Sequence, residues 1–209
     1  MNQIEEANLI RYKNIIDIAI SFSGMNRVFE QGSKQKIAGK LESSFSLLAG
    51  IEGKDDFEKI HSDFCEWFVN NVFTAERVLK NKRVKKSRSA SYGQGAKVFN
   101  IALKVYVYYC NLPDHETAAR LLPMLHSAVD TIMMEHLKKK YPKENLKAET
   151  IEAVNKSDYF VLRKMVNQHI KDEFDKPIRS VHYDDIMWYR LNRRAYRLTS
   201  VSRGKEEID

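Results

Sequence analysis

Lys97 and Asp130 are the two residues of this 209-residue chain whose types and spacing could together carry out a reaction. Lys97 directly precedes one of the most apolar stretches of the chain, VFNIALKVYVYYC, and Asp130 follows beyond the next turn. A neutral lysine amine can attack an electrophilic carbon, and a nearby carboxylate can accept a proton or stabilise a developing positive charge. The pair suggests amine-nucleophile chemistry, provided that the fold brings both groups to one cavity that is wide enough for a nucleoside.

Each of these residues also has a structural explanation that the sequence leaves open. A lysine on an apolar helix can extend its amine to solvent along its own methylene groups. Asp130 fits a capping box that begins at Ser127, with aspartate in place of the usual Glu or Gln. His126 is interpreted as a hydrogen-bonded residue that leads into the helix and not as a catalyst. The polar residues of the 94–111 stretch form one stripe, either the outer face of a packed helix or one wall of a cleft: Gln94, Lys97, Asn100, Lys104 and Asn111.

Helical spacing of apolar residues dominates the elements that must position these groups. Gly and Pro are scarce, at 8 and 4 residues, so we predict an all-α fold in a compact multi-helix globular domain. The aromatic residues of the segment 55–80 are predicted to face the core. The expected helices span 3–20, 25–49, 55–80 and 94–111, then a short helix after Pro113 with Asp114 as N-cap, one that starts near Val129, and 144–155, 157–174 and 184–198.

The helices are expected to form a single domain over residues 1–198. Within it, two lobes at 1–80 and 90–198 would be joined by the basic segment 80–90, and 199–209 would be a flexible C-terminal tail.

The charge of the chain favours a polyanionic partner, most simply nucleic acid, because the net charge is +7 and the pI is near 9.2. Six cations occur within KNKRVKKSR at residues 80–88, just before a glycine-flanked helix start. Cations and open helix N-terminal amides both suit phosphates, although an ordinary solvated loop is the alternative. The predicted nucleic-acid contacts are Lys82, Arg83, Lys85, Lys86, Arg88, Tyr92, Gly93 and Gly95, with Tyr92 or Trp188 able to stack on a base.

The remaining residue types argue against several other classes. Cys65 and Cys110 lie in apolar patterns without a CxxC or Cys/His cluster, so we expect reduced thiols, no metal site and no cofactor. The paired acids Asp184 and Asp185 are interpreted as a helix start. The polar N-terminus and the lack of a long apolar run predict a cytoplasmic protein without a membrane partner. A protein partner stays open and cannot be named.

The pattern YGQGAKVFNIALKVYVYY, followed by LP and then LHSAVDTIMM, resembles the helix–hairpin–helix DNA glycosylases, in particular their archaeal 8-oxoguanine glycosylase branch. The resemblance covers about residues 90–135. It implies a turn at Gly93 and Gly95, a nucleophilic Lys97 and an assisting Asp130. It also implies a two-lobed bundle that prefers DNA to RNA, accepts a flipped nucleotide and cleaves its glycosidic bond, with strand scission through a Schiff base. The same segment is similar to uncharacterised bacterial helical proteins.

Two other function classes compete with this one. A non-enzymatic helical subunit that binds nucleic acid or joins a protein complex would explain the lack of a dense catalytic motif. A ribonuclease of the HEPN type is a lesser alternative, because RKMVNQH places Arg163 before His169 at a spacing similar to that family's Arg/His motif. The similar RLLPMLH segment contains Pro123, which breaks the helix that such a motif needs.

Overall fold

Eight α-helices make up most of the part of the chain that the computed structural model describes, which confirms the all-α prediction. The description covers residues 2–25, 27–78, 82 and 84–203, with residues 193–203 as backbone only. The helices are α1 (Gln3–Phe22), α2 (Ser33–Phe45), α3 (Lys54–Asn71), α4 (Tyr92–Leu103), α5 (His115–Leu121), α6 (Thr131–Lys140), α7 (Lys156–Glu173) and α8 (Ser180–Arg203). Shorter helical turns are η1 (Leu48–Gly50), η2 (Lys104–Tyr109), η3 (Leu122–Met124) and η4 (Ile151–Ala153).

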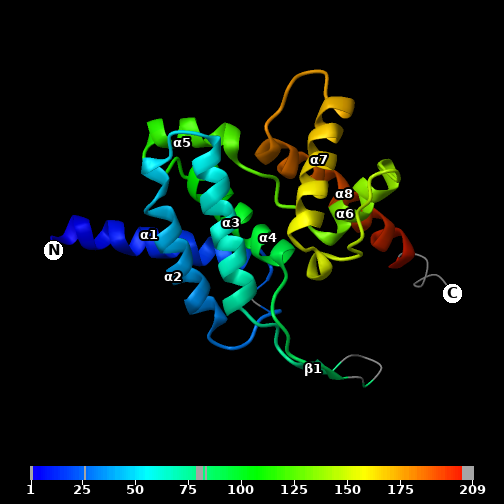
Figure 1. Cartoon of the computed structure of the whole chain (residues 1–209), viewed down its shortest axis with the longest axis horizontal. Helices are drawn as coiled ribbons and strands as arrows, with labels where there is room; N and C mark the ends of the chain where they lie inside the picture. The colour runs from blue at the N-terminus through cyan, green and yellow to red at the C-terminus, as the bar shows by residue number, and fades with distance from the viewer. Residues whose placement is uncertain (1, 26, 79–81, 83, 204–209) are drawn as a thin grey trace.

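α4 is the central helix because nearly all of its side chains are apolar or small. In Figure 1, α1, α2, α3 and α5 lie on one side of α4, and α6, α7 and α8 lie on the other. Eleven of its twelve residues are buried, and Lys97 is the exception. A helix that is apolar all round belongs in the middle of a fold, as expected from the sequence. After α4 the chain continues as the π-helical turn η2, which carries the buried Lys104.

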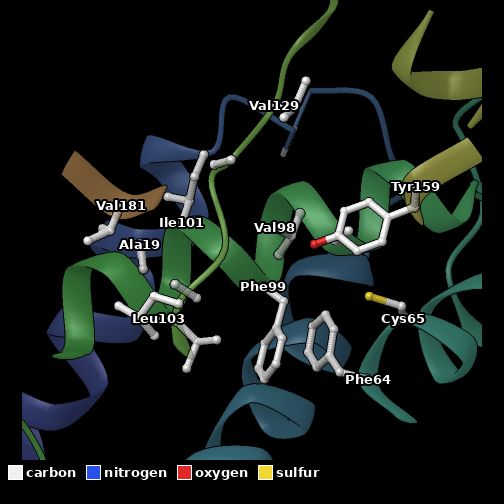
Figure 2. Close-up of a cluster of buried hydrophobic side chains, with 14 of the residues drawn as sticks. Ala19, Phe64, Cys65, Val98, Phe99, Ile101, Leu103, Val129, Tyr159 and Val181 are labelled. Carbon is white, nitrogen blue, oxygen red and sulfur yellow. The ribbon is translucent and has the colours of Figure 1, made fainter. Parts of the chain in front are cut away.

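Aromatic stacking joins α4 to α3, and joins the turn η2 that follows α4 to α2. Phe99 of α4 stacks on Phe64 of α3 with ring centroids 4.3 Å apart (Figure 2), and Phe45 of α2 stacks on Tyr106 at the same distance. Such pairs contribute roughly 0.5–1.5 kcal/mol beyond the burial of their surface. The prediction that the aromatic residues of α3 belong to the core is confirmed for Phe57, Phe64 and Phe68.

Two glycines allow the chain to pack closely at the start of α4. A Cβ atom on Gly93 would lie 2.5 Å from the Cβ of Val154, and one on Gly95 would lie 2.9 Å from the Cβ of Phe68. These distances are shorter than side chains tolerate, so both positions require glycine for packing. Ser91 and Gln94 then start the helix with a reciprocal capping box.

The predicted helix over 55–80 is too long. α3 ends at Asn71, and the chain from Val72 onward forms an extended antiparallel ribbon in which β1 (Arg77–Val78) pairs with β2 (Val84–Lys85). Phe73 pairs with Ser89 nearer the body of the protein. Val, Phe and Thr between residues 72 and 78 favour extended backbone, which explains why the helix stops there.

Other predicted boundaries also change. The predicted helix over 144–155 is wrong, since only the short turn η4 forms in that range. α2 begins at Ser33 after Gly32, which adopts a left-handed conformation with φ of 84°, so the helix predicted from residue 25 starts late. α8 begins at Ser180 and runs to Arg203, so residues 199–203 are helical and not a tail, and 204–209 lie outside the described residues. Asp114 is the N-cap of α5, as predicted.

Candidate functional site

Lys97 and Asp130 line the same cavity, at the junction of α4, the start of α6 and the first turns of α8. The cavity has a volume of about 120 Å³, and Lys104, Asp184, Asp185 and Trp188 also line it. The two groups therefore share one cavity, but its volume is smaller than the room for a nucleoside that the sequence-based hypothesis requires.

Lys97 is the one residue of α4 that is not buried, and its side chain is half-buried at the cavity. Among the described residues, no carboxylate forms an ion pair with its amine and no hydrogen bond to it is found. The lysine therefore carries an amine that is not engaged by the protein, inside a hollow that other polar groups share.

Asp130 caps α6, and this part of its role is structural. Its Oδ1 atom accepts a hydrogen bond of 2.9 Å from the backbone N–H of Met133. The capping box that the sequence suggested from Ser127 is wrong, because Asp130 is itself the N-cap and α6 starts at Thr131. A carboxylate that uses one oxygen to cap a helix retains acceptor capacity on the other. Asp130 can thus hold α6 and still face a ligand in the cavity.

Lys104 is the other lysine of the cavity, and it is fully engaged. Its Nζ atom lies 2.7 Å from a carboxylate oxygen of Asp184 and also forms an ion pair with Asp185, whose Oδ1 accepts a 2.8 Å hydrogen bond from the hydroxyl of Tyr109. Burial alone would lower the pKa of Lys104, but the two carboxylates outweigh it and raise that pKa. Burial raises the pKa of Asp184 to about 6 despite the attraction of Lys104. A lysine held charged in this way is not a nucleophile, which leaves Lys97.

Two exposed aromatic side chains, Trp188 and Phe22, line the cavity as well. They are 58% and 62% exposed, which is unusual for side chains of this size. Tyr92, by contrast, is 5% exposed and packs inside the fold, so the prediction that Tyr92 stacks on a base is wrong. A stacking platform needs an exposed ring, and of the two predicted candidates only Trp188 offers one.

A buried polar network lies next to the cavity and connects α3, α4 and α7. His61 Nε2 is 2.8 Å from Asn100 Oδ1, and Asn100 Nδ2 donates to the hydroxyl oxygen of Tyr159 at 3.1 Å. The Tyr159 oxygen is 2.9 Å from Nδ1 of His126, whose Nε2 is 3.2 Å from Glu58. One assignment of protons satisfies every contact: each donor points along the chain from His61 toward Glu58, with both histidines neutral.

The electrostatics agree with this assignment. Burial lowers the pKa of His61 and of His126, which favours their neutral forms. At the outer end, Arg163 forms a bidentate ion pair with Glu58 at 2.6 and 2.8 Å. Burial would raise the pKa of Glu58, but hydrogen bonds from His126 and Arg163 outweigh it and lower that pKa to about 2. The interpretation of His126 as a hydrogen-bonded residue is confirmed.

This network fixes the loop that carries Asp130. Asn100 lies one helical turn after Lys97 on α4, and its Nδ2 also donates to the backbone carbonyl of Ser127 at 3.0 Å. Ser127 precedes Asp130 by three residues in an irregular loop. The central helix therefore supplies the amine and, through Asn100, holds the segment that supplies the carboxylate.

At the inner end of the network, Cys65 Sγ lies 3.7 Å from Nδ1 of His61, and His61 contacts Asn100. The same sequence of groups, a cysteine, a histidine base and an orienting amide, occurs in enzymes with a cysteine nucleophile. Burial raises the pKa of the Cys65 thiol, and this side chain is 0% exposed (Figure 2). A thiolate does not form there and no substrate reaches it, so the arrangement belongs to the core.

Two described cations of the basic segment 80–88 are held by ion pairs within the protein. Lys85 and Arg88, with Arg77 of β1, converge on the single carboxylate of Glu152 in η4. Lys82 and Lys86 are exposed, while Lys80 and Arg83 lie outside the described residues. Two of the predicted nucleic-acid contacts are therefore already engaged by the protein, and Lys82 and Lys86 stay predictions.

The predicted phosphate cradle at Gly93 and Gly95 is also wrong, for a related reason. The N–H of Gly93 donates to the carbonyl of Val154 at 3.0 Å, that of Gly95 donates to the carbonyl of Ser91, and Gln94 N–H donates to the Ser91 hydroxyl. The amides at the start of α4 are thus used, and both glycines are buried.

Arg163 and His169 do not meet. Arg163 pairs with Glu58 beside His126, whereas His169 contacts the Tyr183 hydroxyl at 2.8 Å and lines a different cavity. Six positions apart on a helix, they point to different sides of α7. This geometry does not favour the HEPN-type alternative.

Comparisons with protein-family models, with curated proteins and with solved structures find no match to this chain. The resemblance to the DNA glycosylases accordingly stays an expectation drawn from residues 90–135. The helices that the structure describes include none that is both long enough and apolar enough to cross a bilayer.

Proposed function

We propose that this protein binds nucleic acid and acts as a lyase on abasic deoxyribose sites, with Lys97 as the amine nucleophile and Asp130 as the assisting carboxylate. The observation that supports it most directly is the shared cavity, in which Lys97 is unengaged while the neighbouring Lys104 is held by two aspartates. The expectation from the sequence named the same two residues.

The size of the cavity favours a sugar over a whole nucleoside. An apolar cavity of about 150 Å³ holds one benzene ring in a well-studied protein. A volume of about 120 Å³ is suited to one five-carbon sugar. A base attached to that sugar would have to stay outside, next to the exposed rings of Trp188 and Phe22. We therefore narrow the glycosylase/lyase expectation to the step that acts on the sugar.

The chemistry that follows uses only groups of the cavity and water. The neutral Lys97 amine adds to the C1′ aldehyde of the ring-opened sugar, and loss of water gives a protonated imine. Asp130 removes a proton from C2′, the C3′–O bond breaks, and the 3′ phosphate leaves with the electron pair of that bond. Water then hydrolyses the unsaturated imine and returns the amine. The carboxylates of the cavity offset the positive charge of the imine.

The nucleic-acid partner is supported by charge, since the chain has a net charge of +7. Lys82 and Lys86 are exposed on the ribbon, where they could contact a phosphate backbone without breaking an ion pair of the fold.

Borohydride trapping tests the proposal. Wild-type protein mixed with a DNA oligonucleotide that contains one abasic site is treated with sodium borohydride, which reduces an imine to a stable amine. We expect a covalent adduct that falls at least about 100-fold in Lys97→Met, because no other unengaged amine of the cavity replaces it. Lys164→Met, which removes an exposed lysine paired with Glu144, is the matched control and should trap like wild type.

Asp130→Asn separates the two roles of Asp130, since asparagine is an equally good N-cap but a poor base. We expect this variant to fold and form the adduct, while strand scission falls about 10²–10³-fold. An adduct that persists in Lys97→Met would overturn the proposal. Salt-dependent DNA binding with neither adduct nor scission would instead assign the chain to the non-enzymatic class. Release of a damaged base from an intact nucleotide would restore the full glycosylase expectation.

A further inference from the structure

A second cavity, of about 440 Å³, lies between the last turns of α6 and α7 and the middle of α8. Its polar lining consists of His136 and Lys140 from α6, His169 and Glu173 from α7, and Arg190 from α8. Four of these five side chains are cationic or can become cationic by binding a proton. The amine chemistry of the first cavity uses none of them.

The two imidazoles are in direct contact. Nε2 of His136 and Nε2 of His169 are 3.4 Å apart, and Nδ1 of His169 is 2.8 Å from the hydroxyl of Tyr183. One hydrogen serves the contact between the two ring nitrogens, and burial lowers the pKa of His169, which favours its neutral form. His169 is 2% exposed and is thereby fixed in orientation.

Two long cationic side chains reach the cavity from different helices, Lys140 from α6 and Arg190 from α8. The guanidinium of Arg190 lies 5.3 Å from the centre of the Phe174 ring, which holds it by a cation–π contact and leaves its N–H groups available. Lys140 forms an ion pair of 2.5 Å with Glu173, and the same carboxylate lies 3.9 Å from His169. Glu173 therefore occupies the place that an external anion would take between Lys140 and the histidine.

We infer that this cavity binds a phosphate group of a nucleic-acid backbone, with Glu173 as an internal competitor for the same cations. Arginine and imidazole N–H groups match phosphate oxygens, and lysine adds a point charge. A metal ion fits the site less well, because no group of three His, Cys, Asp or Glu side chains within the described residues is arranged to hold one.

The position of the cavity is consistent with a strand that also reaches Lys97. Asp130 and Lys140 mark the two ends of α6, ten residues and about 15 Å apart, which is the length of roughly four stacked nucleotides. α8 likewise contributes Trp188 to the first cavity and Arg190 to the second. The inference rests on the nucleic-acid partner of the proposed function but not on its amine chemistry.

Affinity for a fluorescein-labelled single-stranded DNA 12-mer, measured by anisotropy at several KCl concentrations, tests the inference. Arg190→Gln should weaken binding about ten-fold and lower the salt slope by about one. Glu173→Gln should do the opposite and tighten binding about three-fold or more, because it removes the competitor.

Glu149→Gln is the matched control for Glu173→Gln. It removes the same charge from an ion pair with a neighbouring lysine of α6, Lys138, outside the cavity. It should leave affinity within about two-fold of wild type, as expected for an exposed pair. Equal effects of the Glu173 and Glu149 variants would reduce the observation to net charge and overturn the inference, as would an Arg190→Gln variant that binds like wild type.

Inorganic phosphate distinguishes the two sources of a phosphate group. We expect millimolar phosphate to shift the ring proton resonances of His136 and His169, leave those of His61 unchanged and displace the 12-mer. Phosphate that shifts these resonances while no variant changes DNA affinity would overturn a strand as the occupant. If borohydride forms no adduct at Lys97 but Glu173→Gln and Arg190→Gln still change DNA affinity as expected, the proposed lyase activity is wrong and the phosphate site is supported.

Discussion

The sealed network around Asn100 and the open cavity around Lys97 begin one turn apart on the same helix, yet they treat polar groups in opposite ways. In the network, each contact from His61 to Glu58 pairs a donor with an acceptor. In the cavity, Lys104 is paired twice while the Lys97 amine has no partner among the described side chains. The hollow beside His126 and Tyr159 has a volume of only about 30 Å³, against about 120 Å³ for the cavity around Lys97.

This difference separates polar residues that hold the fold from polar residues that can react. Burial makes an unpaired polar group costly, so a fully paired network is a structural device. A polar side chain that lines a hollow without a protein partner is available to a ligand. The two regions are coupled through the Asn100–Ser127 hydrogen bond, which lets the sealed part position the reactive part.

The largest expected loss of stability comes from a substitution in the sealed network. Asn100→Leu keeps the size of the side chain but leaves the carbonyl of Ser127 without its partner and removes one hydrogen bond each from His61 and Tyr159, which still contact each other. We expect it to lower the free energy of unfolding by about 3–5 kcal/mol, since a buried polar group left unpaired costs about 1–3 kcal/mol and each further hydrogen bond lost costs about 0.5–1.5 kcal/mol. Lys97→Met should change it by less than about 1 kcal/mol, because no described contact is lost. Urea unfolding followed by circular dichroism measures both, and equal losses would refute the division between the two regions.

A smaller effect tests the paired lysine of the cavity. Lys104→Met leaves Asp184 buried beside Asp185 without a counter-ion, and we expect a loss of about 2–4 kcal/mol. Adding Asp184→Leu should recover at least half of this loss, because the uncompensated buried charge is then gone. A double variant that is less stable than Lys104→Met alone would show that the pair does not account for the burial of Asp184. Thermal melts of the two variants and wild type supply the comparison.

The smallest expected effect concerns the outer end of the network at low pH. Glu58 has a pKa of about 2 in the fold against an ordinary value of 4.5, so it contributes stability above about pH 4.5 that is lost as the pH falls toward 2. Allowing for its partial exposure, the contribution is about 2 kcal/mol. In Glu58→Gln this part of the acid-induced loss should disappear, so the difference in melting temperature from wild type should narrow as the pH falls from 5 to 2. A difference that stays constant over that range contradicts the role given to Glu58.

Periodicity predicted the central helix and the aromatic core because those features depend on local spacing and on burial. Lys97 and Asp130 could also be chosen from the sequence, since a lysine at an apolar helix and an aspartate before a helix are visible as residue types. Their shared cavity could not be chosen in this way, because it depends on where α8 packs. The stripe from Gln94 to Asn111 was predicted as one face, yet it divides: Asn100 enters the network, and Lys97 and Lys104 face the cavity.

The failures have a common physical cause in long-range partners. The basic segment was interpreted as free because its own sequence gives no sign of Glu152, which lies more than sixty residues later and pairs with two of its cations and with Arg77. The aspartates at 184 and 185 looked like a helix start, but α8 begins earlier and turns them toward Lys104. The histidine pair at 136 and 169 was missed because each residue comes from a different helix. The sequence signal for Lys104 is its position seven residues after Lys97, which places both lysines on one face of the helix.

The first half of α1 extends into solvent at the left of Figure 1, and every residue from Asn2 to Arg11 is exposed. Only from Ile15 onward does the helix bury side chains. Such a segment is stabilised by its own capping box and by being continuous with a turn that is already formed, which removes the cost of nucleation. Unwinding from this end would sacrifice a few backbone hydrogen bonds one at a time and leave the packed half intact. The first turns of α1 can therefore unfold and refold locally, while the packing of its second half against the core stays unchanged.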